Sequence, residues 1–459
     1  MFIGRKNALQ SLEDKYDENK GHLIVVYGKR RLGKTAFLKE FSKDKEHFFY
    51  MCRETIDSEQ IKLFSEEILE DHPIRSFIST FDDWEKAFMF LVNEAKEKRI
   101  LIVIDEFPYL AQSNKSVLST LQSVWDNHGD NTKLMCILTG SSLSYIEDEI
   151  LSEKSPLFGR TTGAIKIDAL TFKESQGILN QFNIEEQIAY FSFLGGVPRY
   201  LKGMNPEKSI SENIDDQFLN KFSFLYQEID FLIREELREP STYYAILGAV
   251  ANGASKIRDI AETTQLDKTK INVYIKNLIQ LNILYKKVPL LLPEEKVNQH
   301  RSLYLFKEPY FKFYFRFIVP NLSLLENDTT HEVLNKRIMP YIDNYIEEDF
   351  QQIAIEHLKE LNGNNKLPHV YQQIGDTWND KVKIPIFGFT NDDWVLAGKA
   401  FYKRLPTMKD IDIIKQDLAI YTKDSQKKTD YFFFINMILS DELETISKLD
   451  EHIHFIKIN

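Results

Sequence analysis

The sequence predicts an α/β fold with a central parallel β-sheet, and three apolar stretches in its N-terminal part carry the prediction. These stretches are His22 to Tyr27, Arg99 to Asp105 and Lys133 to Thr139. Strands that are apolar along most of their length are typical of a parallel sheet covered by helices on both faces. Segments with helical periodicity, such as Trp84 to Ala95 and Val117 to Trp125, lie between them. This alternation indicates βα units.

The first of these strands leads into a segment that matches GxxxxGK[ST], residues 28–35. Gly28 and Gly33 permit backbone geometry that side chains block, so successive N–H groups can point at a triphosphate on the helix N-terminus. Lys34 is expected to reach the β- and γ-phosphates, and Thr35 to offer its hydroxyl to Mg²⁺. The alternative is a glycine-containing turn before a surface helix. The strand, loop and helix order favours a phosphate loop.

Two carboxylates, Asp105 and Glu106, follow directly after the second apolar stretch. At the carboxyl end of a parallel strand, Asp105 is expected to lie beside the phosphate loop and to hold Mg²⁺ through water. Glu106 is placed to polarise the attacking water. A solvated turn or a helix cap is the alternative, and the phosphate loop upstream makes it less favoured.

The third apolar stretch ends in Gly140, Ser141 and Ser142. A polar side chain at this strand end suits a sensor of the γ-phosphate, and Ser141 is the candidate. The alternative is a helix N-cap, because the same residues precede an expected helix from Leu143 to Ile150.

Composition limits the class of protein. The chain has 459 residues, of which 43% are hydrophobic and 28% charged, as expected for a globular protein of about three or four domains. Its formal charge of −11 argues against a whole-chain preference for nucleic acid or an anionic membrane but permits a local basic patch. The longest apolar stretch, Tyr431 to Leu439, is too short to span a membrane.

Cysteine content and the N-terminal residues predict the compartment. The two cysteines, Cys52 and Cys136, each stand in an apolar, strand-like segment, which indicates buried thiols in a reducing environment. Residues 1–6 lack the apolar core of a signal peptide. We therefore expect a cytoplasmic protein with no membrane association.

The pattern becomes mainly helical after the α/β region, with helices expected at Phe172 to Leu179, Glu185 to Leu194 and Ile210 to Glu236. A helical lid over the nucleotide is the interpretation. Four regions are expected in all: a nucleotide-binding core at 1–168, the lid at 169–237, a winged helix with an aromatic connector at 238–328, and a C-terminal domain at 329–459.

Six motifs occur in order between residue 1 and about residue 235: FIGR, GKRRLGKT, LIVIDEFPYL, ILTGSSLSYI, SPLFGRTTGAIKI and GGVPRYL. Together they resemble the archaeal-ATPase family, in the STAND branch of AAA+-like P-loop ATPases. The resemblance implies a switch or scaffold that binds ATP and Mg²⁺.

The resemblance also implies site residues. Those that would bind the nucleotide are Gly28, Lys29, Arg30, Arg31, Leu32, Gly33, Lys34, Thr35, Ala36, Pro198 and Arg199. The metal residues would be Thr35 and Asp105, and the catalytic ones Lys34, Glu106, Ser141 and Arg160. Arg160 matches a family arginine that senses the γ-phosphate, with a structural ion pair as the alternative.

Residues 238–305 resemble a winged helix-turn-helix. Helices are expected at Tyr243 to Ala251, Ser255 to Thr263 and Lys268 to Leu281, and wing strands at Asn282 to Pro289 and His300 to Phe306. Seven basic and three acidic side chains lie between residues 253 and 290: Lys256, Arg258, Lys268, Lys270, Lys276, Lys286 and Lys287, against Asp259, Glu262 and Asp267. Such a module either binds duplex DNA or packs on the lid or a partner.

An aromatic helix, Glu308 to Phe317, and a long amphipathic helix, Val333 to Leu361, lead into the C-terminal domain. Beyond them, strands are expected at Lys383 to Phe389, Trp394 to Tyr402, Tyr431 to Ile435 and His452 to Ile458, with a helix at Met408 to Ile420.

This domain resembles PD-(D/E)XK nucleases. Where such a nuclease needs carboxylates for Mg²⁺, the chain has Ile384, Pro385 and Lys399. Glu347 or Glu348 is a possible third ligand, although acids on an amphipathic helix are usually solvated. We expect an inactive nuclease fold that serves as a binding platform.

Two functions follow. The preferred one is an ATP-binding, slowly hydrolysing switch that couples nucleotide state to recognition of a macromolecule. The alternative is a DNA-binding or DNA-processing regulator in which nucleotide sets the conformation. The expected partners are ATP and ADP, duplex DNA through the winged helix, a protein through the C-terminal domain, and further copies of the chain.

Overall fold

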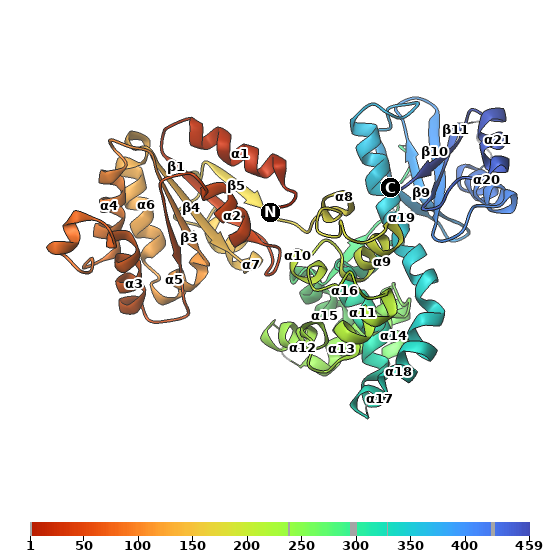
Figure 1. Ribbon diagram of the computed structural model, residues 1–459, viewed down its shortest axis with the longest axis horizontal. Helices are drawn as coiled ribbons and strands as arrows, with labels where there is room; N and C mark the ends of the chain where they lie inside the picture. The colour runs from red at the N-terminus through yellow and green to blue at the C-terminus, as the bar shows by residue number, and fades with distance from the viewer. Residues whose placement is uncertain (1, 237–238, 294–300, 328, 424–426) are drawn as a thin grey trace. The chain divides into compact units, whose positions relative to one another are not determined.

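The computed structural model describes residues 2–236, 239–293, 301–327, 329–423 and 427–459. It divides into two compact units (Figure 1). The first contains the residues up to 170 together with 197–199, and the second contains 171–196 and 200–459. Among the described residues, no helix is both long and apolar enough to cross a membrane.

A parallel sheet of five strands forms the centre of the first unit, in the order β2-β3-β4-β1-β5. Its strands are β1 (His22–Tyr27), β2 (His47–Met51), β3 (Ile100–Asp105), β4 (Leu134–Gly140) and β5 (Gly163–Lys166). Every pairing is parallel. The predicted α/β fold with a parallel sheet is confirmed. Because β1 lies between β4 and β5, the loop that follows it begins at an inner strand of the sheet.

Helices cover both faces of this sheet (Figure 1). On one face lie α3 (Asp57–Leu69), α4 (Trp84–Glu94), α5 (Phe107–Ser113) and α6 (Val117–His128). The other face is covered by α1 (Lys6–Asp17) and α2 (Lys34–Ser42), whose Tyr16 and Phe41 rings meet edge to face. Burial on both faces explains why β3 and β4 have no exposed side chain.

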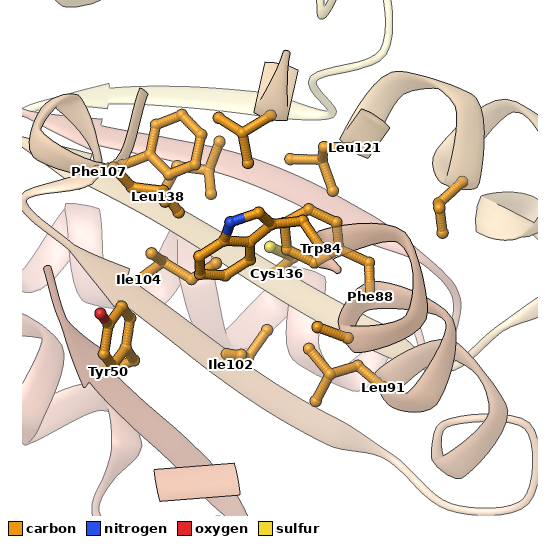
Figure 2. Close-up of a cluster of buried hydrophobic side chains, with 14 of the residues drawn as sticks. Tyr50, Trp84, Phe88, Leu91, Ile102, Ile104, Phe107, Leu121, Cys136 and Leu138 are labelled. Carbon is orange, nitrogen blue, oxygen red and sulfur yellow. The ribbon is translucent and has the colours of Figure 1, made fainter. Parts of the chain in front are cut away.

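A hydrophobic core of this unit lies between the sheet and α3 to α6 (Figure 2). Trp84 and Phe88 of α4 lie over Ile102 of β3 and Cys136 of β4. Burying side chains of this size stabilises the fold by about 1.5–3 kcal/mol each. Cys136 is a free thiol whose pKa burial raises to about 12, so it is protonated at neutral pH, as expected of a structural thiol.

The first part of the second unit is helical. Its helices are α8 (Phe172–Ser175), α9 (Ile184–Leu194), α11 (Ile210–Ile214) and α12 (Phe224–Glu236), with a π-helical turn at Asp215–Leu219. The short helix α10 (Pro198–Leu201) has its first two residues in the first unit and its last two in the second. The prediction of one continuous helix from Ile210 to Glu236 is wrong. The chain leaves helical geometry at Asn220, whose side chain accepts from the N–H of Phe222, and Ser223 then accepts from Tyr226. Such short side chains compete with the helix for backbone donors.

Three helices and a hairpin follow: α13 (Pro240–Ala251), α14 (Ile257–Thr264), α15 (Lys268–Gln280), β6 (Leu284–Lys287) and β7 (Leu303–Phe306). The two strands pair antiparallel. All three predicted helices are present within a few residues of their expected bounds. Of the second predicted wing strand, His300 lies outside the described residues.

The aromatic segment forms α16 (Pro309–Phe313) and a π-helical turn at Tyr314–Ile318. Its aromatic side chains are buried, as their all-round distribution predicted. Phe313 packs against Phe193 of α9, Phe218 and Tyr345, with ring centroids 4.7, 4.6 and 5.6 Å away. This segment therefore joins the helical part of the unit to the long helix that follows.

The C-terminal part is a mixed five-stranded sheet in the order β12-β11-β10-β9-β8. Its strands are β8 (Gln373–Trp378), β9 (Lys383–Phe389), β10 (Trp394–Phe401), β11 (Lys428–Ile435) and β12 (Ile453–Lys457). Strands β10 to β12 run parallel, and β8 to β10 antiparallel. The sheet packs with α19 (Met339–Gly363), α20 (Met408–Thr422) and α21 (Asp441–Leu449). Strand β8 and helix α21 were not predicted.

Candidate nucleotide-binding site

The phosphate loop turns tightly between β1 and α2. A Cβ at Gly28 would lie 2.2 Å from the carbonyl oxygen of Ile167, so only glycine fits there. Gly33 is the N-cap of α2, with φ 84°, a left-handed conformation that glycine adopts at no cost. Gly28 is therefore required by the close approach of the Ile167 carbonyl, and Gly33 by the left-handed turn into α2.

Lys34 begins α2 with its side chain folded over the loop. Its ammonium donates to the carbonyl oxygens of Gly28 and Lys29, at 2.8 and 3.1 Å. Burial lowers the pKa of Lys34, and the nearby carboxylates of Glu106 and Asp105 oppose this shift. A buried ammonium with only backbone carbonyls as hydrogen-bond partners is suited to a phosphate, which would supply the missing negative charge.

Two further arginines brace the loop. Arg5 donates to the carbonyl oxygens of Leu32 and, at 3.3 Å, of Asp168. These contacts tie the N-terminal segment to the phosphate loop through backbone oxygens. Arg30 extends from the loop and donates to the Tyr109 hydroxyl at 3.2 Å. The other loop residue with an unusual backbone is Arg31, whose φ is 70°.

Asp105, at the end of β3, is fully buried and links two hydroxyl groups. Thr35 donates to its Oδ2 at 2.7 Å, and Thr139 of β4 donates to its Oδ1 at 2.5 Å. The predicted metal residues, Thr35 and Asp105, are thus in direct contact. Thr139 was not predicted, although a polar residue at the end of the apolar stretch Leu134 to Leu138 is a signal that could have found it.

Glu106, the next residue, occupies a left-handed backbone conformation, with φ 52° and ψ 44°, at the N-cap of α5. Such geometry is uncommon outside glycine and asparagine. Its Oε2 accepts the hydroxyl of Ser141 at 2.8 Å and the N–H of Ser141 at 3.1 Å. Ser141 is therefore joined to the carboxylate rather than acting as a cap, since α7 (Leu143–Tyr145) begins after Ser142.

The hydroxyl of Thr35 and the carboxylate of Asp105 are hard oxygen donors, which are the ligands that Mg²⁺ prefers together with phosphate and water. Within the described ranges, no group of three or more histidine, cysteine or acidic side chains forms a metal site. The pair fits a cation that takes most of its ligands from a nucleotide and water, and it does not fit a metal held by protein side chains alone.

Arg160, also predicted as a site residue, contacts a carboxylate on α6 and, in the described part of the chain, none of the residues around the phosphate loop. Its Nε and Nη2 donate to the two carboxylate oxygens of Asp126 on α6, at 2.6 and 2.8 Å. This bidentate contact is the ion pair that the sequence left as the alternative. Pro198 and Arg199 begin α10, where Arg199 is exposed, and their proximity to adenine stays a prediction.

Glu347 of α19, which the sequence resemblance suggested as a third metal ligand, faces two cations. Its carboxylate lies 3.5 Å from the ammonium of Lys399 and 3.6 Å from Nε of Arg404. The expectation that these acids are solvated is wrong for Glu347, of which 22% of the side chain is exposed, and holds for Glu348, of which 69% is exposed. Arg404 also pairs with Asp410 at 3.0 Å. Burial acts to raise the pKa of Asp410, but the hydrogen bonds from Arg404 and Thr407 outweigh burial and lower this pKa to about 2.

Comparisons with known proteins agree with this geometry. Residues 2–204 match a family described as an ATPase domain predominantly from Archaea, and residues 314–413 match a family of archaeal and bacterial proteins of unknown function. The Methanocaldococcus jannaschii protein MJECL04 is 32% identical over 446 residues, which cover 97% of each chain. A second protein of that organism, MJ1637, is 24% identical over 337 residues, covering 65% of this chain and 63% of its own.

Solved structures with a similar fold include the Walker-type ATPase PABY2304 of Pyrococcus abyssi, at 20% identity and a TM-score of 0.48, covering 69% of this chain and 96% of its own. Another is the Aeropyrum pernix ORC2 protein, at 16% identity and a TM-score of 0.45; the match covers 75% of this chain and 94% of the ORC2 chain. Both TM-scores are below 0.5, so the assignment rests on the sequence relatives.

The parallel sheet, its phosphate loop and the family match define an ATP-binding P-loop ATPase. The chain belongs to the archaeal ATPase family, as its similarity to MJECL04 over nearly the whole length of both proteins shows.

Proposed function

We propose that the protein is a Mg²⁺-dependent ATPase of low turnover, and that its nucleotide state controls recognition of a macromolecular partner. The observation that carries the proposal is the cluster at the carboxyl ends of β1, β3 and β4. Thr35 is hydrogen-bonded to Asp105 and Ser141 to Glu106, and the Lys34 ammonium is held on carbonyl oxygens of the phosphate loop beside them. These residues are those that phosphoryl transfer to water requires.

In this proposal each residue has a separate task. Lys34 exchanges its backbone carbonyl partners for phosphate oxygens, which gain more from its charge. Thr35 and Asp105 hold Mg²⁺, which when bound neutralises the charge that develops on the phosphates. Glu106 accepts a hydrogen bond from the attacking water and orients it. Ser141 keeps the Glu106 carboxylate at the end of β4, next to the loop.

ATP binding is the first test. Lys34→Ala is expected to abolish binding of ATP with Mg²⁺, measured by titration calorimetry on the full chain, because the buried cation is lost. Lys43→Ala is the matched control, since Lys43 is an exposed lysine just after the same helix. Tight binding of ATP by Lys34→Ala would contradict the proposed site.

A second candidate function is recognition of duplex DNA by the winged helix that we assign to α13, α14, α15 and the β6–β7 hairpin. The favouring observation is that Lys268, Lys270 and Lys276 are exposed on α15. A helix with exposed lysines suits contact with phosphates beside a groove.

Not every basic residue of this region supports DNA binding. Lys287 pairs with Asp376 at 2.7 Å, and Arg258 lies 3.3 Å from Asp259 and 3.7 Å from Glu262. The candidate surface is therefore smaller than the sequence count indicated, and its exposed lysines are the three of α15 together with Lys286 of β6. Filter binding of duplex DNA, with and without ATP, separates the two functions: DNA binding that ATP alters supports the regulator, and the absence of DNA binding in both conditions leaves the switch with a different partner.

The four-region division and the role of the C-terminal domain belong to the same proposal. We assign the domain from about residue 329 a platform role, for a protein partner or another copy of the chain. The reason is that Glu347, the acid that the described contacts bring to Lys399, is paired with Lys399 and Arg404. Cytoplasmic location completes the proposal. Light scattering with and without ATP measures whether copies of the chain associate.

A further inference from the structure

A buried carboxylate with several imidazole neighbours lies in the C-terminal sheet. Asp430 stands on β11, and only 1% of its side chain is exposed. Its Oδ2 accepts the hydroxyl of Tyr371 at 2.6 Å, and its Oδ1 lies 3.1 Å from Nδ1 of His452. These contacts hold the carboxylate in one orientation inside the domain.

Two further imidazoles approach the same group. Nε2 of His369 lies 3.6 Å from Oδ2 of Asp430, and Nε2 of His454 lies 3.7 Å from Oδ1. His454 belongs to β12, His452 directly precedes that strand, and His369 lies in the segment between α19 and β8. Their side chains are 26–44% exposed, in contrast to the acid behind them. One buried carboxylate thus supports three partly exposed imidazoles.

The carboxylate is ionised at neutral pH. Burial acts to raise the pKa of Asp430, but the neighbouring His454 imidazole and the hydrogen bonds from Tyr371 and His452 outweigh it and hold the pKa below its usual value. This carboxylate lies 3.7 Å from Nε2 of His454, whose side chain also lines a surface hollow.

That surface is a cavity of about 520 Å³, which we name the Asp430 pocket. Its lining includes Asn365, Lys366, Phe432, Ser447, His454 and Phe455. No carboxylate belongs to the lining among the described residues. The Ser447 hydroxyl already donates to the carbonyl of Ile453, at 3.0 Å. The donors that remain are the ammonium of Lys366, the amide of Asn365 and the imidazole of His454.

Aromatic side chains form the other part of the pocket. The Phe432 ring stacks on His454, with 4.7 Å between centroids and 24° between planes. Phe455 belongs to the same wall. Cationic and amide donors beside aromatic rings, with no acid in the lining, suit a ligand that is an anion at one end and apolar at the other.

We propose that the Asp430 pocket binds a small molecule that carries a phosphate group on an aromatic or apolar body. Lys366, Asn365 and His454 hold the phosphate oxygens, and Phe432 and Phe455 contact the body. Asp430 does not touch the ligand; it positions His454. The pocket uses no residue of the nucleotide site, so its occupation does not depend on the proposed ATPase activity.

The test uses the full chain with Lys34→Ala, which removes the phosphate loop as a competing site, and phenyl phosphate as the probe. Phenol and inorganic phosphate are the matched controls, because each carries one half of the probe. Saturation-transfer NMR and titration calorimetry are expected to show phenyl phosphate binding more tightly than either control.

Substitutions then locate the site. Lys366→Ala and His454→Gln are each expected to weaken phenyl phosphate binding about tenfold or more, since hydrogen bonds to charged groups are the strong ones. Lys359→Ala, an exposed lysine on the preceding helix α19, is expected to leave binding unchanged. A melting curve shows whether each variant is folded, and His454→Gln keeps a polar side chain at a position where alanine would leave a void.

Three results would overturn the proposal. They are the absence of phenyl phosphate binding, binding that neither Lys366→Ala nor His454→Gln alters, and phenol binding as tight as phenyl phosphate. The first or second would assign the Asp430 cluster a structural role. The third would make the pocket an apolar hollow without a phosphate site.

Discussion

Ser141 donates two hydrogen bonds to one oxygen of Glu106, from its hydroxyl at 2.8 Å and from its N–H at 3.1 Å. These bonds join the ends of two neighbouring strands, β3 and β4. They hold the Glu106 carboxylate, to which we assign the orientation of the attacking water, against the residue that follows β4. Movement of either strand end therefore changes the position of the other group.

Glu106→Gln is expected to retain ATP binding and to lower hydrolysis about a hundredfold or more, because the amide cannot act as the base-like group for water. Nucleotide affinity by calorimetry and phosphate release separate the two effects. Glu97→Gln, an exposed glutamate outside the site, serves as the control. Equal hydrolysis by Glu106→Gln and the parent would remove Glu106 from its role.

Ser141→Ala is expected to lower hydrolysis about tenfold while ATP affinity stays close to that of the parent. The loss is smaller than for Glu106→Gln because the N–H of residue 141 still donates to the carboxylate. Steady-state phosphate release at saturating ATP measures it. Should Ser142→Ala, at the N-cap of α7, have the same effect, the sensor role would not belong to Ser141.

Arg160→Ala is expected to lower hydrolysis and to leave ADP affinity nearly unchanged, if Arg160 reaches the γ-phosphate in one conformation of the switch. Asp126→Asn is the informative partner, since it removes the ion pair and keeps the arginine. A sensing arginine predicts that only Arg160→Ala lowers hydrolysis. Parallel losses of activity and melting temperature in both variants would instead make the pair structural.

The exposed lysines of α15 are expected to control DNA binding. Changing Lys268, Lys270 and Lys276 together to glutamate should abolish binding of duplex DNA at low salt, and in the parent log affinity should fall linearly with log salt. Fluorescence anisotropy over a salt series measures both. A control with three exposed lysines of other regions changed to glutamate, Lys96, Lys154 and Lys202, should bind as the parent does. If the parent does not bind DNA at low salt, the module is a packing element.

The C-terminal domain is expected to cleave no DNA with Mg²⁺ or Mn²⁺. The acid nearest Lys399, Glu347, is neutralised by Lys399 and Arg404, and Asp410 caps α20 in a capping box with Thr407. Incubation with linear, circular and single-stranded DNA, followed by gel electrophoresis, tests this. Cleavage that is lost on changing Asp392, Asp393, Asp410 or Asp412 to alanine would show relocated metal ligands.

Local patterns were sufficient for much of this protein. The GxxxxGK[ST] segment between a strand and a helix predicted the phosphate loop, because within eight positions its glycines meet the backbone geometry of the loop and its Lys and Thr meet the chemistry of phosphate and Mg²⁺. Apolar runs predicted β1, β3 and β4, and aromatic residues on every face of the segment from Pro309 predicted its burial. Each of these features depends on neighbours in the chain, so a single sequence records it.

The contacts that complete each site depend on the tertiary structure. Thr139 meets Asp105 and Ser141 meets Glu106 because β4 is the neighbour of β3, and strand order is not written in either segment. Likewise, Asp430 meets His369 across 61 residues of chain, and Arg160 meets Asp126 across 34. Side-chain hydrogen bonds act over about 3 Å. Only the folded chain therefore decides which distant residues make them.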